Sequence, residues 1–320
     1  MAARAQKPSA FLARPQPDAD ADDPAMSTAA TLGAGKRWKR YALVTPLCVT
    51  TILTVLVSLS LILALSFQTV DVVKLFTSLT TDAYVEELGR PLFWRLLWRS
   101  IMIALAVTAV TILLAYPAAY FISFKSGKMK NALLIVASAP FFTSYLLRIF
   151  GWKIILGYNG ILNALLVDSG LISEPLQTLV YRPGTVVVAL AHAYLAFAIL
   201  PIYVALDRID RSLMEAASDL GARPHINFLR IVLPLSMPGV ISAALLIFVP
   251  TVGDYITPTL IGGPDGSMVA NLIQSAFGKS NDWPAGSAMS VATILAVAVP
   301  LAAIYGLHHQ LKKRAEAAAA

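Results

Sequence analysis

Asp254 and Tyr255 stand at the end of a long apolar stretch in which charged residues are rare. A carboxylate contributes charge and an aromatic face contributes a cation–π contact, so this pair could bind an organic ammonium ion. An acid at membrane depth is costly and is usually functional. The other interpretation is that Asp254 caps a helix at the outer surface of a membrane. The sequence supports both interpretations.

Four more aromatic residues are candidates for the path of such a cation: Tyr84, Phe142, Tyr145 and Trp283. Aromatic residues also gather at the two interfaces of a membrane, where they form belts. The belt is the alternative interpretation for all four. His192 lies in the middle of an apolar run, where we expect a hydrogen bond within a helix bundle rather than a proton relay.

A second group of residues has the spacing of a docking surface. Residues 215–221 read Glu-Ala-Ala-Ser-Asp-Leu-Gly, and after nine residues the chain continues with Ile-Val-Leu-Pro at 231–234. Alanine is the strongest helix former, and a glycine can end a helix in the left-handed conformation. The alanines permit close packing against another protein, and Glu215 offers a charge for a partner's Arg or Lys. The alternative is an ordinary cytoplasmic helix-turn-helix loop.

Two short helices are therefore expected in this loop. Asp210 and Ser212 are of the types that cap the start of a helix. Pro224 suits the first turn of a second helix. Pro234 and Pro238 are expected to mark the turn of the chain back into the membrane.

Nucleotide hydrolysis has no motif in this sequence. A phosphate-binding loop needs G-x-x-x-x-G-K-[ST]. Residues 278–280, Gly-Lys-Ser, match its end, but Ile273 stands at the first glycine position. Paired histidines inside the membrane, or an acid and a base at matched depth, are also missing, which argues against a membrane enzyme. Any ATP hydrolysis must then come from a partner protein.

The composition points to a membrane protein. The chain has 320 residues, of which 57% are hydrophobic and 13% are charged, whereas a soluble domain is about 25% charged. The net charge of +7 comes from short basic clusters beside apolar runs. That arrangement is typical of membrane topology and does not favour a nucleic-acid partner.

Six segments are apolar and long enough to cross a membrane, which takes ~20 helical residues. They are residues 43–67 and about 100–124, 131–149, 184–206, 234–254 and 285–307. The segment 158–170 is too short to span, and we expect a short helix at the outer surface. The prediction is an all-α integral membrane protein with one six-helix domain at 41–310 and a core at about 95–307. Residues 1–40 are predicted to be a disordered tail, and residues 311–320 a second tail.

Charge sets the orientation, because cytoplasmic loops are enriched in Lys and Arg. Basic clusters at 36–40, 125–130, 208–230 and 312–314 fall on one side if the chain crosses six times. Both termini and the loop with Glu215 are then cytoplasmic. Arg90, Arg95 and Arg99 fall on the other side, and we expect them on an interfacial helix that leads into the second span.

The loop at 215–234 resembles the EAA loop of bacterial binding-protein-dependent importers, with every defining position met. The resemblance extends over about residues 60–310 and is strongest to spermidine/putrescine permease subunits. The matching stretches are Ser144–Gly151, Asn159–Asn163, 215–239, Gly253–Gly263 and Asp282–Gly286.

The resemblance implies the type I ABC importer permease architecture in the bacterial inner membrane and transport by alternating access. It implies two ATPase subunits, a second permease subunit and an extracytoplasmic substrate-binding protein as partners. ATP and Mg would bind at the ATPase, and this chain would be a non-catalytic subunit without a cofactor. The residues expected to couple it to the ATPase are Glu215, Ala216, Ala217, Asp219, Gly221, Ile231, Leu233 and Pro234.

The substrate implied by the resemblance is a polyamine. An importer of the same family for an opine or an amino-acid derivative is the first alternative, and a membrane enzyme is a remote one. A basic rather than acidic cavity lining would favour the first alternative.

Overall fold

The structure, a computed structural model, describes residues 24–68, 79–176 and 179–319, with side chains only between residues 45 and 302. The described residues form helices and contain no strand. They fall into two units, residues 1–60 and 61–320.

The first long helix, α1 (Pro24–Leu65), contains the first candidate span, Thr45–Leu65. It also includes residues 24–40, which belong to the predicted N-terminal tail, so the structure gives this part of the tail as helix. Proline suits the first helical position, and the alanines between residues 25 and 34 favour a helix. Residues 1–23 lie outside the described residues.

Hydroxyl groups in the apolar part of α1 are satisfied within the helix. Thr50, Thr51, Thr54 and Ser58 each donate a hydrogen bond of 2.8–2.9 Å to the carbonyl oxygen four residues earlier. Lipid offers these groups no partners, so this back-bonding allows hydroxyl side chains in a spanning helix.

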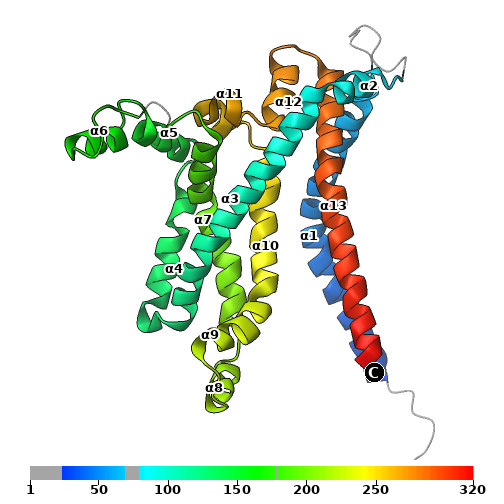
Figure 1. Cartoon of the computed structure of the whole chain (residues 1–320). Helices are drawn as coiled ribbons and strands as arrows, with labels where there is room; N and C mark the ends of the chain where they lie inside the picture. The colour runs from blue at the N-terminus through cyan, green and yellow to red at the C-terminus, as the bar shows by residue number, and fades with distance from the viewer. Residues whose placement is uncertain (1–23, 69–78, 177–178, 320) are drawn as a thin grey trace, which may run out of the picture. The chain divides into compact units, whose positions relative to one another are not determined.

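The second unit contains the remaining helices (Figure 1). Those that precede the loop with Glu215 are α2 (Asp82–Gly89), α3 (Pro91–Phe124), α4 (Lys130–Ser138), α5 (Tyr145–Leu156), α6 (Ile161–Asp168) and α7 (Pro183–Asp207). Those from that loop onward are α8 (Arg211–Asp219), α9 (Pro224–Asn227), α10 (Leu233–Val252), α11 (Gly263–Gly266), α12 (Val269–Gly278) and α13 (Trp283–Ala319). Short 3-10 helices lie at Gly127–Met129 and at Ala139–Phe142 (η3), and π-helices lie at Phe228–Val232 (η4) and Pro258–Gly262.

The core is built by α3, α7 and α10, which pack against one another. Helix α10 lies close to α7 at Gly239. A Cβ atom there would lie 2.4 Å from the Cβ of Ala205 and 2.6 Å from the carbonyl oxygen of Pro201. Small residues at such crossings allow two membrane helices to come into backbone contact.

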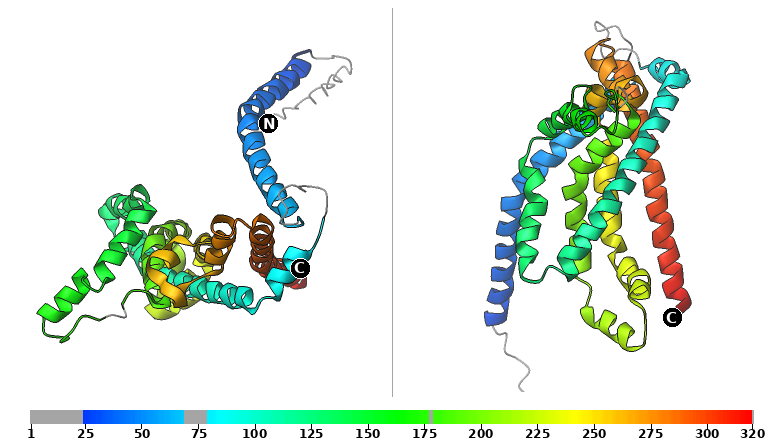
Figure 2. Two further views of the ribbon diagram at one scale, coloured as in Figure 1. Left: turned by 90° about the horizontal axis from the view of Figure 1, so that it is seen from above. Right: turned by 60° about the vertical axis from the view of Figure 1, so that its left-hand side comes forward.

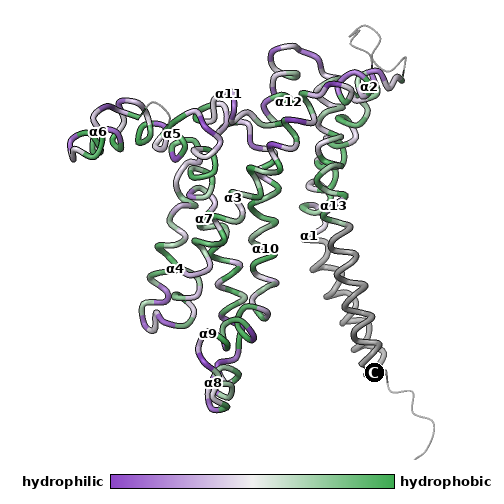
Figure 3. The backbone as a smooth tube through the Cα atoms, in the orientation of Figure 1, coloured by the Kyte–Doolittle hydropathy of each residue, from purple (hydrophilic) through white to green (hydrophobic). Residues whose placement is uncertain are grey.

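Within the described residues, six helical segments are long and apolar enough to cross a membrane, which confirms the predicted number. Figure 3 shows that α3, α7 and α10 are mostly hydrophobic along their length and more hydrophilic toward their ends. The predicted third span, 131–149, is wrong as a continuous helix. The candidate third span is Tyr145–Asp168, which contains α5 and α6.

Pro140 explains the break in the predicted third span. It has no backbone N–H to continue α4, so the chain tightens into η3. Thr143 and Ser144 are then extended, with ψ angles of 141° and 134°, and α5 begins at Tyr145. Helices α5 and α6 run across the end of the bundle where α7 begins, not along it (Figures 1 and 2). A short helix at 161–168 is confirmed, and its place at the outer surface stays a prediction.

A smaller apolar cluster joins α3 to α12 and α13. It includes Phe93, Leu97 and Met289, all buried. The arginines near this end do not share one interfacial helix, because α3 begins at Pro91 and contains Arg95 and Arg99.

Arg90, just before α3, forms ion pairs with Glu86 and Glu87 of α2. Burial raises the pKa of the Glu87 carboxyl above its ordinary value, although the Arg90 guanidinium acts to lower it.

We predict that Gly239→Leu separates α7 from α10. The added side chain would overlap Ala205 and Pro201, and overpacking of this kind costs about 1–3 kcal/mol or more. Thermal survival of the purified protein in detergent should fall, as followed by size-exclusion chromatography after heating.

Gly184→Leu is the matched control, because no atom lies within 4 Å of a Cβ at Gly184. Equal thermal survival of the two variants would contradict the close packing of α7 and α10.

Candidate functional site

The loop between α7 and α10, residues 208–232, is the interspan loop. Its first helix, α8, starts with a side-chain cap. The Asp210 carboxylate accepts a hydrogen bond of 3.0 Å from the backbone N–H of Ser212. This bond holds the pKa of the Asp210 carboxyl below its ordinary value. The predicted cap and the predicted helix are both confirmed.

The end of α8 is a Schellman motif centred on Gly221. The N–H of Gly221 bonds to the carbonyl of Ser218 at 2.9 Å, and the N–H of Ala222 bonds to the carbonyl of Ala217 at 3.0 Å. Gly221 has a φ of 82°, as the sequence predicted for a helix-ending glycine. No atom lies within 4 Å of a Cβ at this position. The glycine is therefore needed for its backbone conformation and not for space.

Asn227 joins α9 to α8. Its side-chain amide nitrogen donates to the Met214 carbonyl at 3.1 Å and to the Ser218 hydroxyl at 3.0 Å. The side chain is buried. Asn227 lies within the nine-residue spacer of the motif, where its sequence environment carries no signal, so sequence reasoning missed it.

The return to the bundle is a continuous helical segment and not a turn at Pro234. The segment from Pro224 runs through η4 into α10. In η4 the N–H of Leu233 bonds to the carbonyl of Phe228, five residues earlier. Such a π-helical stretch accommodates Pro234, which has no N–H of its own. The predicted turn at Pro234 and Pro238 is wrong.

Aromatic contacts fix this segment against α3. The ring of Phe228 lies 5.7 Å from that of Tyr116 and 6.0 Å from that of Tyr120, edge to face in both cases. The Tyr116 and Ser236 hydroxyls share a hydrogen bond of 2.8 Å.

The interspan loop exposes surface to which a partner could bind. Glu215, Ala216 and Asp219 are exposed, and Ala217 is half-buried. Leu220 is 89% exposed although it lies outside the candidate spans. A cleft of about 370 Å³ separates α8 from the end of α3. Of the other motif residues, Ile231 and Leu233 are half-buried and Pro234 is exposed.

Asp254 lies two residues after the end of α10 and is buried, with 8% of its surface exposed. One carboxylate oxygen accepts the backbone N–H of Ile256 at 2.9 Å. The other accepts the hydroxyl of Tyr145 at 2.7 Å. No Lys or Arg pairs with this carboxylate in the part of the chain described. Asp254 therefore caps the next helical turn, as one interpretation of the sequence expected.

Tyr255 and Trp283 both line a cavity of about 540 Å³ between α12, α13 and the end of α10. Phe277 adds a third ring, 5.5 Å from that of Trp283. The residues that line the cavity include no charged side chain.

The structure does not bring the other two aromatic candidates to either place. Tyr84 donates a hydrogen bond to the Ser66 hydroxyl at 2.8 Å, and its ring lies 5.3 Å from that of Phe67. Phe142 is 90% exposed. His192 accepts a hydrogen bond of 3.2 Å from the Trp152 indole, as expected within a helix bundle.

Comparisons with known proteins agree on one family. Residues 115–317 match the family model for the binding-protein-dependent transport system inner membrane component. The spermidine/putrescine transport system permease protein PotB of Haemophilus influenzae is 36% identical over 262 residues, covering 82% of this chain and 91% of that protein. PotB of Escherichia coli K12 is 34% identical, covering 74% of this chain and 86% of that protein.

The fold is shared with a solved transporter. A chain of the bacterial alginate ABC transporter, in complex with an alginate pentasaccharide-bound periplasmic protein, superimposes with a TM-score of 0.62. The two chains are 18% identical, and the match covers 82% of this chain and 93% of the other.

We predict that Gly221→Val loosens the corner between α8 and α9. A β-branched residue in the left-handed conformation costs about 1–2 kcal/mol, so the corner should open and cleavage by a protease in residues 219–223 should accelerate. The Gly221→Asn variant should be cleaved more slowly than the Gly221→Val variant, because asparagine tolerates the left-handed conformation. Equal cleavage of both variants would show that φ is not the constraint at this position.

Proposed function

Because this chain belongs to the family of binding-protein-dependent transport system inner membrane components, we propose that it is the permease subunit of an ATP-driven importer of polyamines such as spermidine and putrescine. The substrate rests on the 36% identity to the Haemophilus protein over most of both chains. The six candidate spans and the family make the chain a multi-pass inner-membrane protein. It is a transport component and not an enzyme.

The importer assembles from this chain, a second permease subunit, two ATPase subunits and an extracytoplasmic substrate-binding protein. ATP and Mg²⁺ bind at the ATPase subunits, and this chain binds no cofactor. The incomplete phosphate-loop motif around residues 273–280 supports this division of labour. Both termini and the interspan loop lie in the cytoplasm, as the distribution of basic clusters indicates.

The interspan loop docks onto the ATPase through the exposed face of α8. Leu213 and Leu220, 48% and 89% exposed, leave apolar surface that a partner would cover. Glu215 and Asp219 place negative charge on the same helix. The Schellman motif and Asn227 make the loop a stiff unit, so displacement of α8 reaches α10 through the continuous helix from Pro224. ATP drives the change because it binds the closed ATPase better than the open one.

The path of the cation involves two groups: the carboxylate of Asp254, and the cavity lined by Tyr255, Phe277 and Trp283. Asp254 supplies a carboxylate that, among the described residues, pairs with no Lys or Arg and accepts the hydroxyl of Tyr145. The cavity with Tyr255, Phe277 and Trp283 supplies aromatic faces for ammonium groups. A lining without Lys or Arg gives no support to an anionic opine as substrate. Tyr84 and Phe142 lie outside these two groups.

We predict that the complex reconstituted in vesicles imports labelled spermidine and that Glu215→Lys removes this uptake, because the substitution reverses a docking charge on α8. ATPase subunits should also co-purify less with the variant. Glu174→Lys, an equivalent change at another exposed acid, should import normally. A wild-type complex that imports an opine or an amino-acid derivative and not spermidine would replace the proposed substrate.

We predict that Asp254→Asn lowers spermidine uptake several-fold without loss of thermal stability. Asparagine keeps an oxygen for the Ile256 N–H, and its amide can donate to the Tyr145 hydroxyl, so only the charge is lost. Asp254→Ala should lower both uptake and stability, because it also removes the cap. Unchanged uptake by the asparagine variant would reduce Asp254 to a helix cap.

A further inference from the structure

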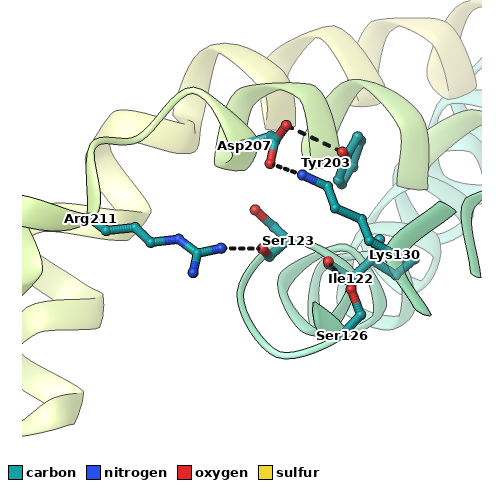
Figure 4. A network of polar contacts seen from close by, with 7 residues as sticks. All are labelled: Ile122, Ser123, Ser126, Lys130, Tyr203, Asp207 and Arg211. Atoms are coloured by element: carbon teal, nitrogen blue, oxygen red, sulfur yellow. Dashed lines mark hydrogen bonds and ion pairs between the residues drawn. The ribbon is translucent and has the colours of Figure 1, made fainter. Parts of the chain in front are cut away.

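Two charged contacts join the corner between α7 and α8 to the end of α3 and the start of α4 (Figure 4). In the first, the Nζ atom of Lys130 lies 2.5 Å from an oxygen of Asp207. Lys130 is the first residue of α4 and Asp207 is the last residue of α7. The hydroxyl of Tyr203 donates to the second oxygen of Asp207 at 3.2 Å, and the Lys130 Nζ lies 5.3 Å from the centre of the Tyr203 ring.

The second contact uses Arg211, the first residue of α8. Its guanidinium donates a hydrogen bond of 3.2 Å to the Ser123 carbonyl and lies 6.0 Å from the centre of the Phe124 ring. The last carbonyls of α3 have no partners within the helix. The Ser126 hydroxyl satisfies the carbonyl of Ile122, and Arg211 satisfies that of Ser123. A positive charge is favourable at this end of a helix.

The two contacts flank the corner between α7 and α8. Asp207 lies on one side of that corner and Arg211 on the other. A shift of α8 away from the end of α3 breaks the charge-assisted hydrogen bond of Arg211, and a shift of the end of α7 away from α4 breaks the ion pair between Lys130 and Asp207. The Lys130 and Asp207 side chains are 31% and 38% exposed. An ion pair this exposed adds little to stability, so its geometric role is the more important one.

We propose that Lys130, Asp207 and Arg211 form a strut that makes the α3–α4 turn move together with α8. Displacement of α8 by the ATPase then reaches α3 and α4 directly, in addition to α10 through the helix from Pro224. These three are positioning residues, since none belongs to the two groups proposed above for the path of the cation. The proposal rests on the docking of α8 proposed above and adds a second route from α8 to the spans.

The first test measures coupling in the reconstituted full complex. Lys130→Glu places two acids in contact and should lower spermidine uptake per ATP hydrolysed several-fold, while ATPase activity persists. Lys130→Arg should behave like the wild type, and the exchanged pair Lys130→Glu/Asp207→Lys should recover most of the uptake. Lys128→Glu is the matched control, because Lys128 lies on the same turn and forms no ion pair among the described residues.

The second test does not depend on the substrate. Spin labels at residues 128 and 212, in a Cys48→Ser background, report the distance between the α3–α4 turn and α8. This distance should stay constant between the nucleotide-free and ATP-bound complex, and should change with ATP in Lys130→Glu. A complex that fails to import spermidine but keeps the constant distance overturns the proposed substrate and retains the strut. A distance that changes with ATP in the parent protein, or Lys130→Glu with normal uptake per ATP, overturns the strut.

Discussion

Lipid gives the backbone no hydrogen-bond partners, so each backbone polar group of a spanning segment must be satisfied within the protein. This constraint explains the local irregularities of the chain as well as its helices. Hydroxyls of α1 bond back to carbonyls four residues earlier. The π-helical stretch η4 accommodates Pro234 without interrupting the helix into α10. Where the chain does leave helical geometry after α10, the buried carboxylate of Asp254 caps the next turn.

The same requirement connects the membrane part to the interspan loop. The end of α3 leaves carbonyls without partners, and Arg211 of α8 satisfies one of them from the loop. The aromatic ring of Phe228 packs on two tyrosines of the same helix. The interspan loop is thus held from two sides, by α3 and by its covalent connection to α10. The docking proposed above needs a loop that moves as a body, and these contacts favour such motion.

The core illustrates how small residues replace a hydrophobic driving force between helices. Lipid tails are as apolar as the side chains themselves, so close van der Waals contact must supply the association. Gly239 provides it by admitting the backbone of α7 at Pro201 and Ala205. Large apolar residues on the outer faces, such as Leu113 of α3 at 73% exposure, are left for lipid or for another subunit.

Hydropathy, charge clusters and the 215–234 motif determined the number of spans, the cap at Asp210, the helix-ending role of Gly221 and the family, because these depend on residues close together in the sequence. The third span was placed wrongly. A hydropathy average does not register that Pro140 interrupts the backbone hydrogen bonds with which α4 would continue. Only the tertiary structure decided that Tyr145 reaches Asp254, that Asn227 joins α9 to α8, and that Lys130 and Arg211 meet partners 77 and 88 residues away. Such pairs form when helices distant in sequence pack side by side, and no local pattern specifies that packing.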